Sequence, residues 1–206
     1  MLKKVGNYLS YFNSSSKEIL EAMNKIDRKD FMPSNFKSEA YLDEAMPIEK
    51  GQTISQPSTV ARMLQLLELK KGDSVLEIGT GSGWNAALIG FLVGKKGKVL
   101  SLEIITELAE KAKTNIKKQK LENVVVKEEN FLKIKQKFDK IIFTAGILYP
   151  KEIKIEEFAY EHLKNKGILV CPYRQGPLII LEKQQNKIKK TSTKEDYVFV
   201  PLIVSK

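Results

Sequence analysis

Cysteine, histidine and tryptophan each occur once in these 206 residues. The single cysteine, Cys171, excludes a disulfide within the chain and leaves a cysteine-based zinc site without ligands, so we expect no metal. The single histidine, His162, falls in a predicted helix and has no matching Ser-acid pattern, so a Ser-His-acid triad is not indicated. This composition favours a reducing, cytoplasmic environment.

Long apolar runs are also absent. No stretch reaches the roughly 18 residues that a membrane-spanning helix needs, and the beginning of the chain lacks the apolar core of a secretory signal. Hydrophobic residues make up 42% of the chain and charged residues 29%, which is a globular balance. We therefore expect one domain over residues 1–206, a monomer, and no membrane as a partner.

Arginine is scarce, with only Arg28, Arg62 and Arg174, although the net charge is +10. A basic chain can indicate a nucleic acid partner. However, the other basic residues are lysines, which are solvated point charges, whereas arginine supplies the fork that reads phosphate and guanine. The lysines are also scattered at helix-surface spacing, so a nucleic acid partner is the less favoured interpretation.

The first third of the chain has few regular patterns. A helix is expected over 15–27, where Ser15 and Glu18 have the spacing of a capping box. Residues 31–55 are irregular, and such a long irregular stretch is often functional. Another helix is expected to begin at Pro57, because proline is favoured at the first helical position.

Strands and helices alternate after residue 73, which predicts an α/β fold of the Rossmann-like class. We expect a mostly parallel central sheet with helices on both faces, and an antiparallel hairpin of the last two strands at its edge. Thr106 is a candidate N-cap. This divides the domain into a helical, substrate-binding segment (1–70) and a nucleotide-binding core (71–206). The expected strands are 74–79, 98–104, 123–129, 140–146, 167–173, 178–184 and 197–204, and the expected helices 84–93, 106–120 and 151–164.

A glycine-rich turn, VLEIGTGSG (75–83), joins the first of these strands to a helix. Glycines allow positive φ and close approach of a ligand to the backbone. The spacing is G-x-G-x-G, with Trp84 where the dinucleotide fingerprint has its third glycine, and no G-K-[ST] follows. A phosphate-binding loop is therefore disfavoured. We expect Trp84 to be a packing residue.

Acidic residues end three successive strands. Glu103 is placed to accept both hydroxyls of a ribose. Glu77 is placed to face a cationic amino-acid group, and Glu128 and Glu129 lie where an adenine amino group needs an acceptor. The alternative interpretation is that the glycines only form a tight turn and that the glutamates are solvated strand ends.

The segment before this loop, MPIEKGQTISQPSTVARMLQLLEL (46–69), closely resembles protein-L-isoaspartate (D-aspartate) O-methyltransferases, a family of class I methyltransferases that use S-adenosylmethionine. The resemblance continues, in order, over about residues 20 to 204. The further matching blocks are IDRKDFMP (26–33), AYLDEAMPI (40–48), FDKIIFTAG (138–146), LKNKGILVCP (163–172) and FVPLI (199–203).

The resemblance implies methyl transfer from S-adenosylmethionine to the α-carboxylate of isoaspartyl residues in damaged proteins and peptides, which starts their repair and leaves S-adenosylhomocysteine. It implies that Ser55 is the catalytic residue, with Thr53 beside it, and that Gly51 and Gln52 lie next to the cofactor. The expected cofactor contacts in the core are Glu77, Ile78, Gly79, Thr80, Gly81, Ser82, Gly83, Glu103, Ile104, Glu128 and Glu129.

Some features leave alternatives open. Ser55 precedes Pro57 and could instead cap the following helix. The segment Glu128-Glu129-Asn130 stands where the family often has Gly-Asp-Gly, and Glu49 and Lys50 depart from the family's usual residues at the substrate rim. Two other functions are weighed beside the main one: a nucleic acid (tRNA) methyltransferase, motivated by the charge, and a catalytically inactive S-adenosylmethionine-binding module.

Overall fold

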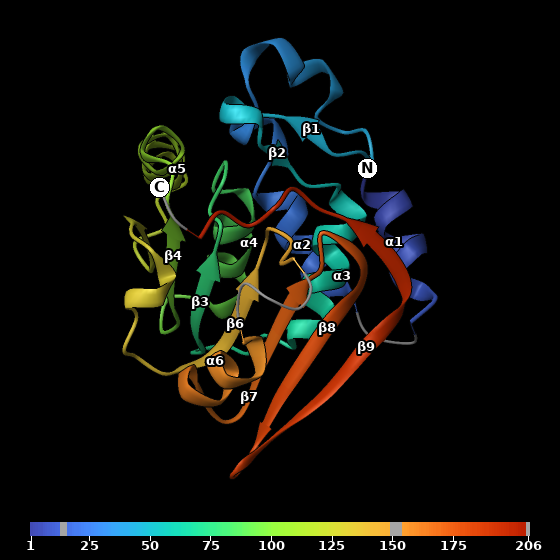
Figure 1. Ribbon diagram of the computed structural model, residues 1–206. Helices are drawn as coiled ribbons and strands as arrows, with labels where there is room; N and C mark the ends of the chain where they lie inside the picture. The colour runs from blue at the N-terminus through green and yellow to red at the C-terminus, as the bar shows by residue number, and fades with distance from the viewer. Residues whose placement is uncertain (13–15, 149–153, 205–206) are drawn as a thin grey trace.

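A computed structural model describes residues 1–12, 16–148 and 154–204. Its centre is a seven-stranded sheet in the order β5-β4-β3-β6-β7-β8-β9 (Figure 1). The pairs among β3 to β7 are parallel, and β7-β8 and β8-β9 are antiparallel. This confirms the expected mostly parallel sheet with an antiparallel end. The strands are β3 (Ser74–Ile78), β4 (Lys98–Glu103), β5 (Val124–Glu128), β6 (Phe138–Phe143), β7 (Leu163–Pro172), β8 (Gln175–Gln184) and β9 (Lys187–Val198).

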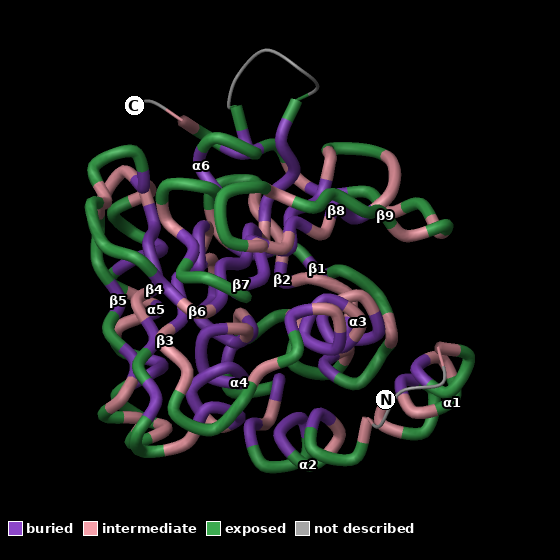
Figure 2. The backbone as a smooth tube through the Cα atoms, turned by 90° about the horizontal axis from the view of Figure 1, so that it is seen from below, coloured by how far each residue is buried: buried purple, intermediate pink, exposed green. Residues whose placement is uncertain are grey.

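Helices cover both faces of the sheet, so the central strands are buried between them (Figure 2). One face packs against the first five helices, and the other packs against α6 and the chain after β9. Alternate residues of a strand serve the two faces, as Val75 and Leu76 show. The helices are α1 (Leu2–Ser10), α2 (Lys17–Lys25), α3 (Pro57–Leu67), α4 (Trp84–Val93), α5 (Thr106–Lys118) and α6 (Ile155–His162).

Most of the expected elements are confirmed within a few residues. Pro57 is the first residue of α3, and α4 has the expected bounds. The helix α1 was not predicted. The proposed capping partner Ser15 lies outside the described residues, as does the beginning of the helix expected at 151–164. No membrane-spanning helix is found in the described part of the chain.

Two expectations were wrong. The last strand is β9 (187–198), not 197–204. Its residues are mostly polar because the β8-β9 hairpin extends beyond the helices (Figure 1), so they carry little apolar signal. The second error is Thr106, which is the first residue of α5 and not its N-cap, since Ile105 holds that position. The Thr106 hydroxyl donates instead to Glu128 on β5, 2.7 Å away.

Short elements replace the irregular stretch expected at 31–55. They are the 3-10 turns η1 (Arg28–Phe31), η2 (Ser34–Glu39) and η3 (Glu49–Gly51), and a two-stranded ribbon of β1 (Met46–Pro47) and β2 (Thr53–Ile54). Figure 1 shows this ribbon above the carboxyl ends of the parallel strands, with the chain after β9 crossing below it. We call the segment 46–54, whose tip is η3, the hairpin.

A buried arginine holds the base of this hairpin. The side chain of Arg28 is fully buried and donates hydrogen bonds to five backbone carbonyls, including those of Ile54 and Ser55. Its guanidinium also lies over the ring of Trp84, 5.5 Å from the ring centroid. Burial lowers the pKa of Arg28 to about 10, partly offset by Asp43, so the guanidinium stays charged at neutral pH. Those hydrogen bonds compensate for the lost hydration of the cation.

A buried carboxylate lies at the end of β3. Glu77 is fully buried, and its carboxylate accepts hydrogen bonds from the Asn85 amide at 2.8 Å and from the Ser101 hydroxyl. Desolvation raises the pKa of Glu77 to about 7; the two hydrogen bonds oppose this shift, and the charge of Glu103 adds to it. Ser101 also shares a 2.6 Å hydrogen bond with Thr80, so this network links β3, β4 and the glycine loop.

We predict that Arg28→Lys lowers the free energy of unfolding by about 3 kcal/mol, because a lysine cannot reach five carbonyls and leaves buried acceptors without partners. Urea denaturation measures the change. The exposed Arg174 offers the matched control, and Arg174→Lys should alter stability by less than about 0.5 kcal/mol. Equal stability of the two variants would contradict the role given to Arg28.

We predict that the free energy of unfolding decreases as pH rises from 4.5 to 7, because Glu77 loses its proton at a higher pH in the folded chain than in the unfolded chain. In this window the folded chain keeps a proton on Glu77 that the unfolded chain has released, so the free energy of unfolding decreases, in total by about 3 kcal/mol. Glu77→Gln removes the titration. The free energies of unfolding of both proteins are therefore measured at pH 4.5 and at pH 8. The difference between the two proteins should change with pH. A constant difference would rule out the raised pKa.

Candidate functional site

Two clefts open at the carboxyl ends of the parallel strands. The first is an open cleft with about 610 Å³ of space between its atoms, including the solvent at its mouth. The second, with about 440 Å³, lies beside it under the start of α3. The clefts share four lining residues: Thr53, Gly79, Gly81 and Thr144. A ligand in the first cleft can therefore reach a ligand in the second at this junction.

The glycine loop separates the two clefts. Gly79 has φ +95°, and a Cβ there would lie 2.6 Å from the Thr144 hydroxyl oxygen, so only glycine fits. The Thr144 hydroxyl donates to the carbonyls of Ile78 and Gly79. On the other side, the Leu102 carbonyl accepts from the amides of Gly79 and Thr80. Neighbouring strands thus hold the loop open at a topological switch point, where α/β sheets bind ligands.

Glu103 is the most strongly positioned carboxylate in the first cleft. It is only 6% exposed. One oxygen accepts from the Gly81 amide at 2.9 Å, and the other accepts from the amides of Ile104 and Ile105 at 2.9 and 3.0 Å. A carboxylate has about four acceptor positions, so it retains capacity for further hydroxyl donors. The backbone therefore presents Glu103 to the cleft before any ligand arrives.

The other predicted acids are placed differently. Glu129 lines the first cleft, whereas Glu128 is exposed and accepts a hydrogen bond from Thr106. Glu77 lies behind the loop and lines neither cleft. Instead it orients Asn85, which does line the second cleft. The Asn85 amide nitrogen donates to Glu77, and the Asn85 Oδ1 atom is buried with no partner among the described residues.

Ser55 lines the second cleft, and Thr53 lines both. The alternative role of Ser55 as a helix cap is wrong, because the N-cap of α3 is Gln56 and the Ser58 amide is satisfied by the Asp43 carboxylate at 2.8 Å. The Ser55 hydroxyl is therefore not used by α3. Ser55 lines a cleft whose apolar wall includes Val60, Met63 and Trp84.

The sequence predictions cover much of the cleft lining, and the structure brings most of these residues together. Ile78, Ile104 and Gln52 line the first cleft, and Thr80 and Ser82 line the second. Gly51 and Gly83 line neither. The resemblance also implied Ile54, which lines the second cleft. The lining residues that sequence reasoning missed are Val60, Met63, Asn85, Leu102, Ile105, Leu108, Phe131, Thr144, Ala145, Val200, Pro201, Leu202 and Ile203, and Trp84 was expected only to pack.

The segment after β9 is the largest of the missed parts. It pairs with Gly146 through backbone hydrogen bonds at Val200 and Leu202, which places it along the first cleft. Asn130 fastens its end, since the Asn130 amide donates to the Val204 carbonyl at 2.6 Å. Two sequence signals fell on this segment: the apolar pattern that predicted a strand at 197–204, and the resemblance of FVPLI to the family. The substituted 128–130 segment therefore supplies an anchor for the wall of the cleft.

The remaining singled-out residues have structural surroundings. The Cys171 thiol is buried, which raises its pKa well above the usual value and keeps it protonated. The ring of His162 packs on Phe158, with 4.5 Å between centroids, and its Nδ1 is 3.1 Å from the Gln136 carbonyl oxygen. Trp84 is buried and donates to the Ile26 carbonyl. The described residues contain no cluster of three or more metal-ligating side chains.

Comparisons with known proteins agree with this geometry. The profile of the family described as "Protein-L-isoaspartate(D-aspartate) O-methyltransferase (PCMT)" matches residues 6–206. A protein-L-isoaspartate O-methyltransferase of Fervidobacterium nodosum is 45% identical over 168 residues, which are 80% of this chain and 81% of that protein. Protein-L-isoaspartate O-methyltransferase 2 of Archaeoglobus fulgidus is 41% identical over 193 residues, covering 91% of this chain and 85% of that protein.

Solved structures show the same fold. One protein-L-isoaspartate O-methyltransferase superposes with a TM-score of 0.81 at 29% identity, covering 98% of this chain and 65% of that longer chain. A Plasmodium falciparum structure, solved in complex with S-adenosyl-L-homocysteine, has a TM-score of 0.80 at 22% identity and covers 99% of this chain and 98% of that chain. The chain therefore belongs to the protein-L-isoaspartate (D-aspartate) O-methyltransferase family of S-adenosylmethionine-dependent enzymes.

Proposed function

We propose that this chain transfers a methyl group from S-adenosylmethionine to the α-carboxylate of isoaspartyl residues in damaged proteins, at the junction of the two clefts. The observation that carries this location is that Thr53, Gly79, Gly81 and Thr144 line both clefts. The first cleft then holds the nucleoside of the cofactor, and the second receives its amino-acid end together with the end of the acceptor side chain. Family membership supports this function over a nucleic acid methyltransferase and over an inactive module.

The residues present fit the cofactor along its whole length. Glu103, held by three amides, would accept from the ribose hydroxyls, and Glu129 would accept from the adenine amino group. Beyond the loop, the orphaned Oδ1 of Asn85 would accept from the α-ammonium group. Glu77 would act through Asn85 by fixing the orientation of its amide. When bound, the cofactor supplies an electrophilic methyl group.

The acceptor side needs alignment more than acid-base chemistry. An isoaspartyl carboxylate has a pKa of about 4, so it is ionised at neutral pH and needs no general base. Ser55 and Thr53 would donate hydrogen bonds that hold this carboxylate in line with the methyl group. The apolar wall of Val60, Met63 and Trp84 would exclude water, which strengthens the attraction between the carboxylate and the sulfonium.

Residues 1–70 and 71–206 would then divide the work, because the hairpin and α3 supply the acceptor side and the core supplies the cofactor side. We predict that the protein is a cytoplasmic monomer that acts on isoaspartyl proteins and peptides and has no nucleic acid partner.

We predict methylation of an isoaspartyl peptide and no methylation above background of the matched aspartyl peptide. The two peptides differ only in which carboxylate enters the backbone, so the comparison tests recognition of the α-carboxylate. Transfer of a radiolabelled methyl group measures both. Methylation of transfer RNA with neither peptide methylated would replace the proposed function by the nucleic acid alternative.

We predict that Ser55→Ala lowers kcat by about 100-fold, through loss of alignment, while the affinity for S-adenosylhomocysteine stays within about twofold. Steady-state kinetics and calorimetry give the two values. Thr59→Ala, in the first turn of α3 and outside both clefts, is the control and should retain activity. A parallel loss of activity and cofactor affinity in Ser55→Ala would indicate a structural role for the serine.

A further inference from the structure

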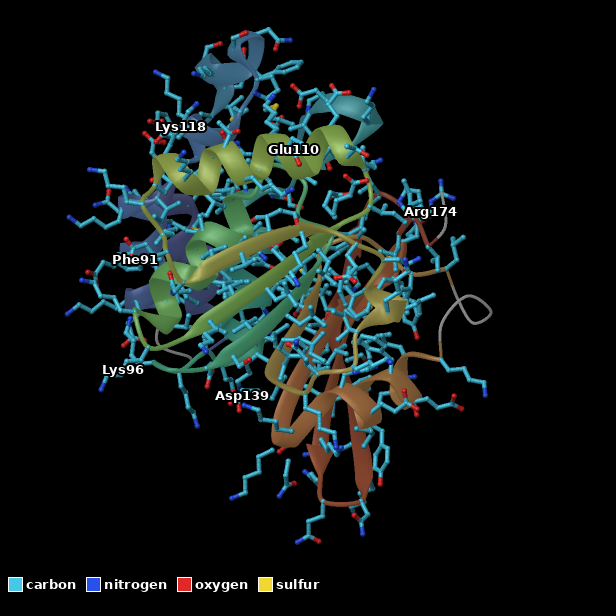
Figure 3. The ribbon with its side chains drawn as sticks, turned by 90° about the vertical axis from the view of Figure 1, so that its left-hand side faces the viewer. Phe91, Lys96, Glu110, Lys118, Asp139 and Arg174 are labelled. Atoms are coloured by element: carbon cyan, nitrogen blue, oxygen red, sulfur yellow. The ribbon has the colours of Figure 1, made fainter. Side chains whose placement is uncertain are left out.

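The tip of the hairpin is tied to α5 by two ion pairs. The Lys50 ammonium lies 2.7 Å from a Glu107 carboxylate oxygen, and the Lys111 ammonium donates a hydrogen bond to Glu49. The pairs lower the pKa of Glu49 and raise the pKa of Lys50, which favours the charged form of both side chains. Figure 3 shows the hairpin tip over the beginning of α5, at the end of the helix near Glu110 and away from Lys118. The two pairs therefore join the hairpin to α5.

These ion pairs lie close in the chain to residues that line the first cleft. Gln52 and Thr53 line the first cleft and directly follow the hairpin tip. Ile105 and Leu108 also line it; Ile105 immediately precedes α5, and Leu108 lies in its first turn. Ile48 lies over the glycine loop, since a Cβ on Gly81 would be 3.7 Å from its Cδ1 atom. The hairpin therefore forms a cover over the cofactor side of the site.

The two ends of the hairpin are held by different means. At the base, the carbonyls of Ile54 and Ser55 bind the buried Arg28 guanidinium. At the tip, the paired side chains are between 31% and 55% exposed, so salt and water reach them. Lys50 at the tip also has φ +58°, an uncommon conformation for a residue with a side chain. The tip is therefore the end that can leave α5 while the base stays fixed.

We propose that Glu49 and Lys50 are positioning residues whose ion pairs with Lys111 and Glu107 hold residues 49–53 closed over the cofactor and set the rate at which S-adenosylhomocysteine leaves. This inference rests on the proposed function of the first cleft. We call these two ion pairs the clasp.

The paired substitution Glu49→Gln and Lys50→Gln removes both ion pairs and leaves the net charge unchanged. We expect the dissociation rate of S-adenosylhomocysteine and the KM for S-adenosylmethionine to rise about 10-fold, as expected from losing two partly exposed pairs, while kcat does not fall. Chasing radiolabelled S-adenosylhomocysteine with unlabelled compound measures the rate. Salt should accelerate dissociation from the unmodified protein and have little effect on the variant.

The chain offers a matched control on the same helix. Lys113 and Glu110 form an ion pair of 2.7 Å within α5 that does not reach the hairpin, so Glu110→Gln with Lys113→Gln should leave the dissociation rate unchanged. A charge exchange, Glu49→Lys with Lys111→Glu, should restore slow dissociation that Glu49→Lys alone has lost.

Dissociation rates within about twofold of each other in the unmodified protein, the clasp variant and the control would overturn the clasp. An equal increase in the clasp and control variants would also overturn it. Absence of any binding heat between S-adenosylhomocysteine and the unmodified protein would instead contradict the proposed function itself, so the two failures are distinguishable.

Discussion

The Arg28 guanidinium is the contact on which the acceptor side of this protein depends. It comes from a short 3-10 turn near the beginning of the chain, yet it binds carbonyls at two separate places, the 40–44 segment and the end of the hairpin. A cation that is fully buried must be surrounded by acceptors, and these acceptors belong to backbone that has no long helix or strand to satisfy it. The same charge thus compensates for its own burial and orders the loop that carries Ser55.

The cofactor side depends on the sheet. Parallel strands of different lengths end at one edge, and the loop after β3 takes its hydrogen bonds from both neighbours, Leu102 on β4 and Thr144 after β6. Because the backbone holds Glu103 with three amides, no rearrangement is needed to present that carboxylate. The catalytic requirement is modest, since both reactants already carry their charges, and a site that aligns them and excludes water is sufficient.

The limits of sequence reasoning follow from the kind of signal each element carries. Apolar runs located α4 and the buried strands, because an element that is buried on all sides is apolar along most of its length. It failed for β9, whose residues 187–198 are mostly exposed, and for Thr106, whose hydroxyl bonds to a neighbouring strand and not to its own helix. In each case the deciding contacts come from another part of the chain, which no local pattern records.

The sequence by itself determined the fold class, the cofactor class and the two motifs that meet at the site, because glycine spacing, strand-end acids and the GQTISQP block are local features. Only the tertiary structure decided which side chains face the clefts. It turned Glu77 away from the ligand and Asn85 toward it, and it brought residues 200–203 alongside a loop more than 100 positions earlier. The physical reason is that burial and hydrogen-bond satisfaction are properties of the whole packed chain, and they select among the many orientations that one sequence segment permits.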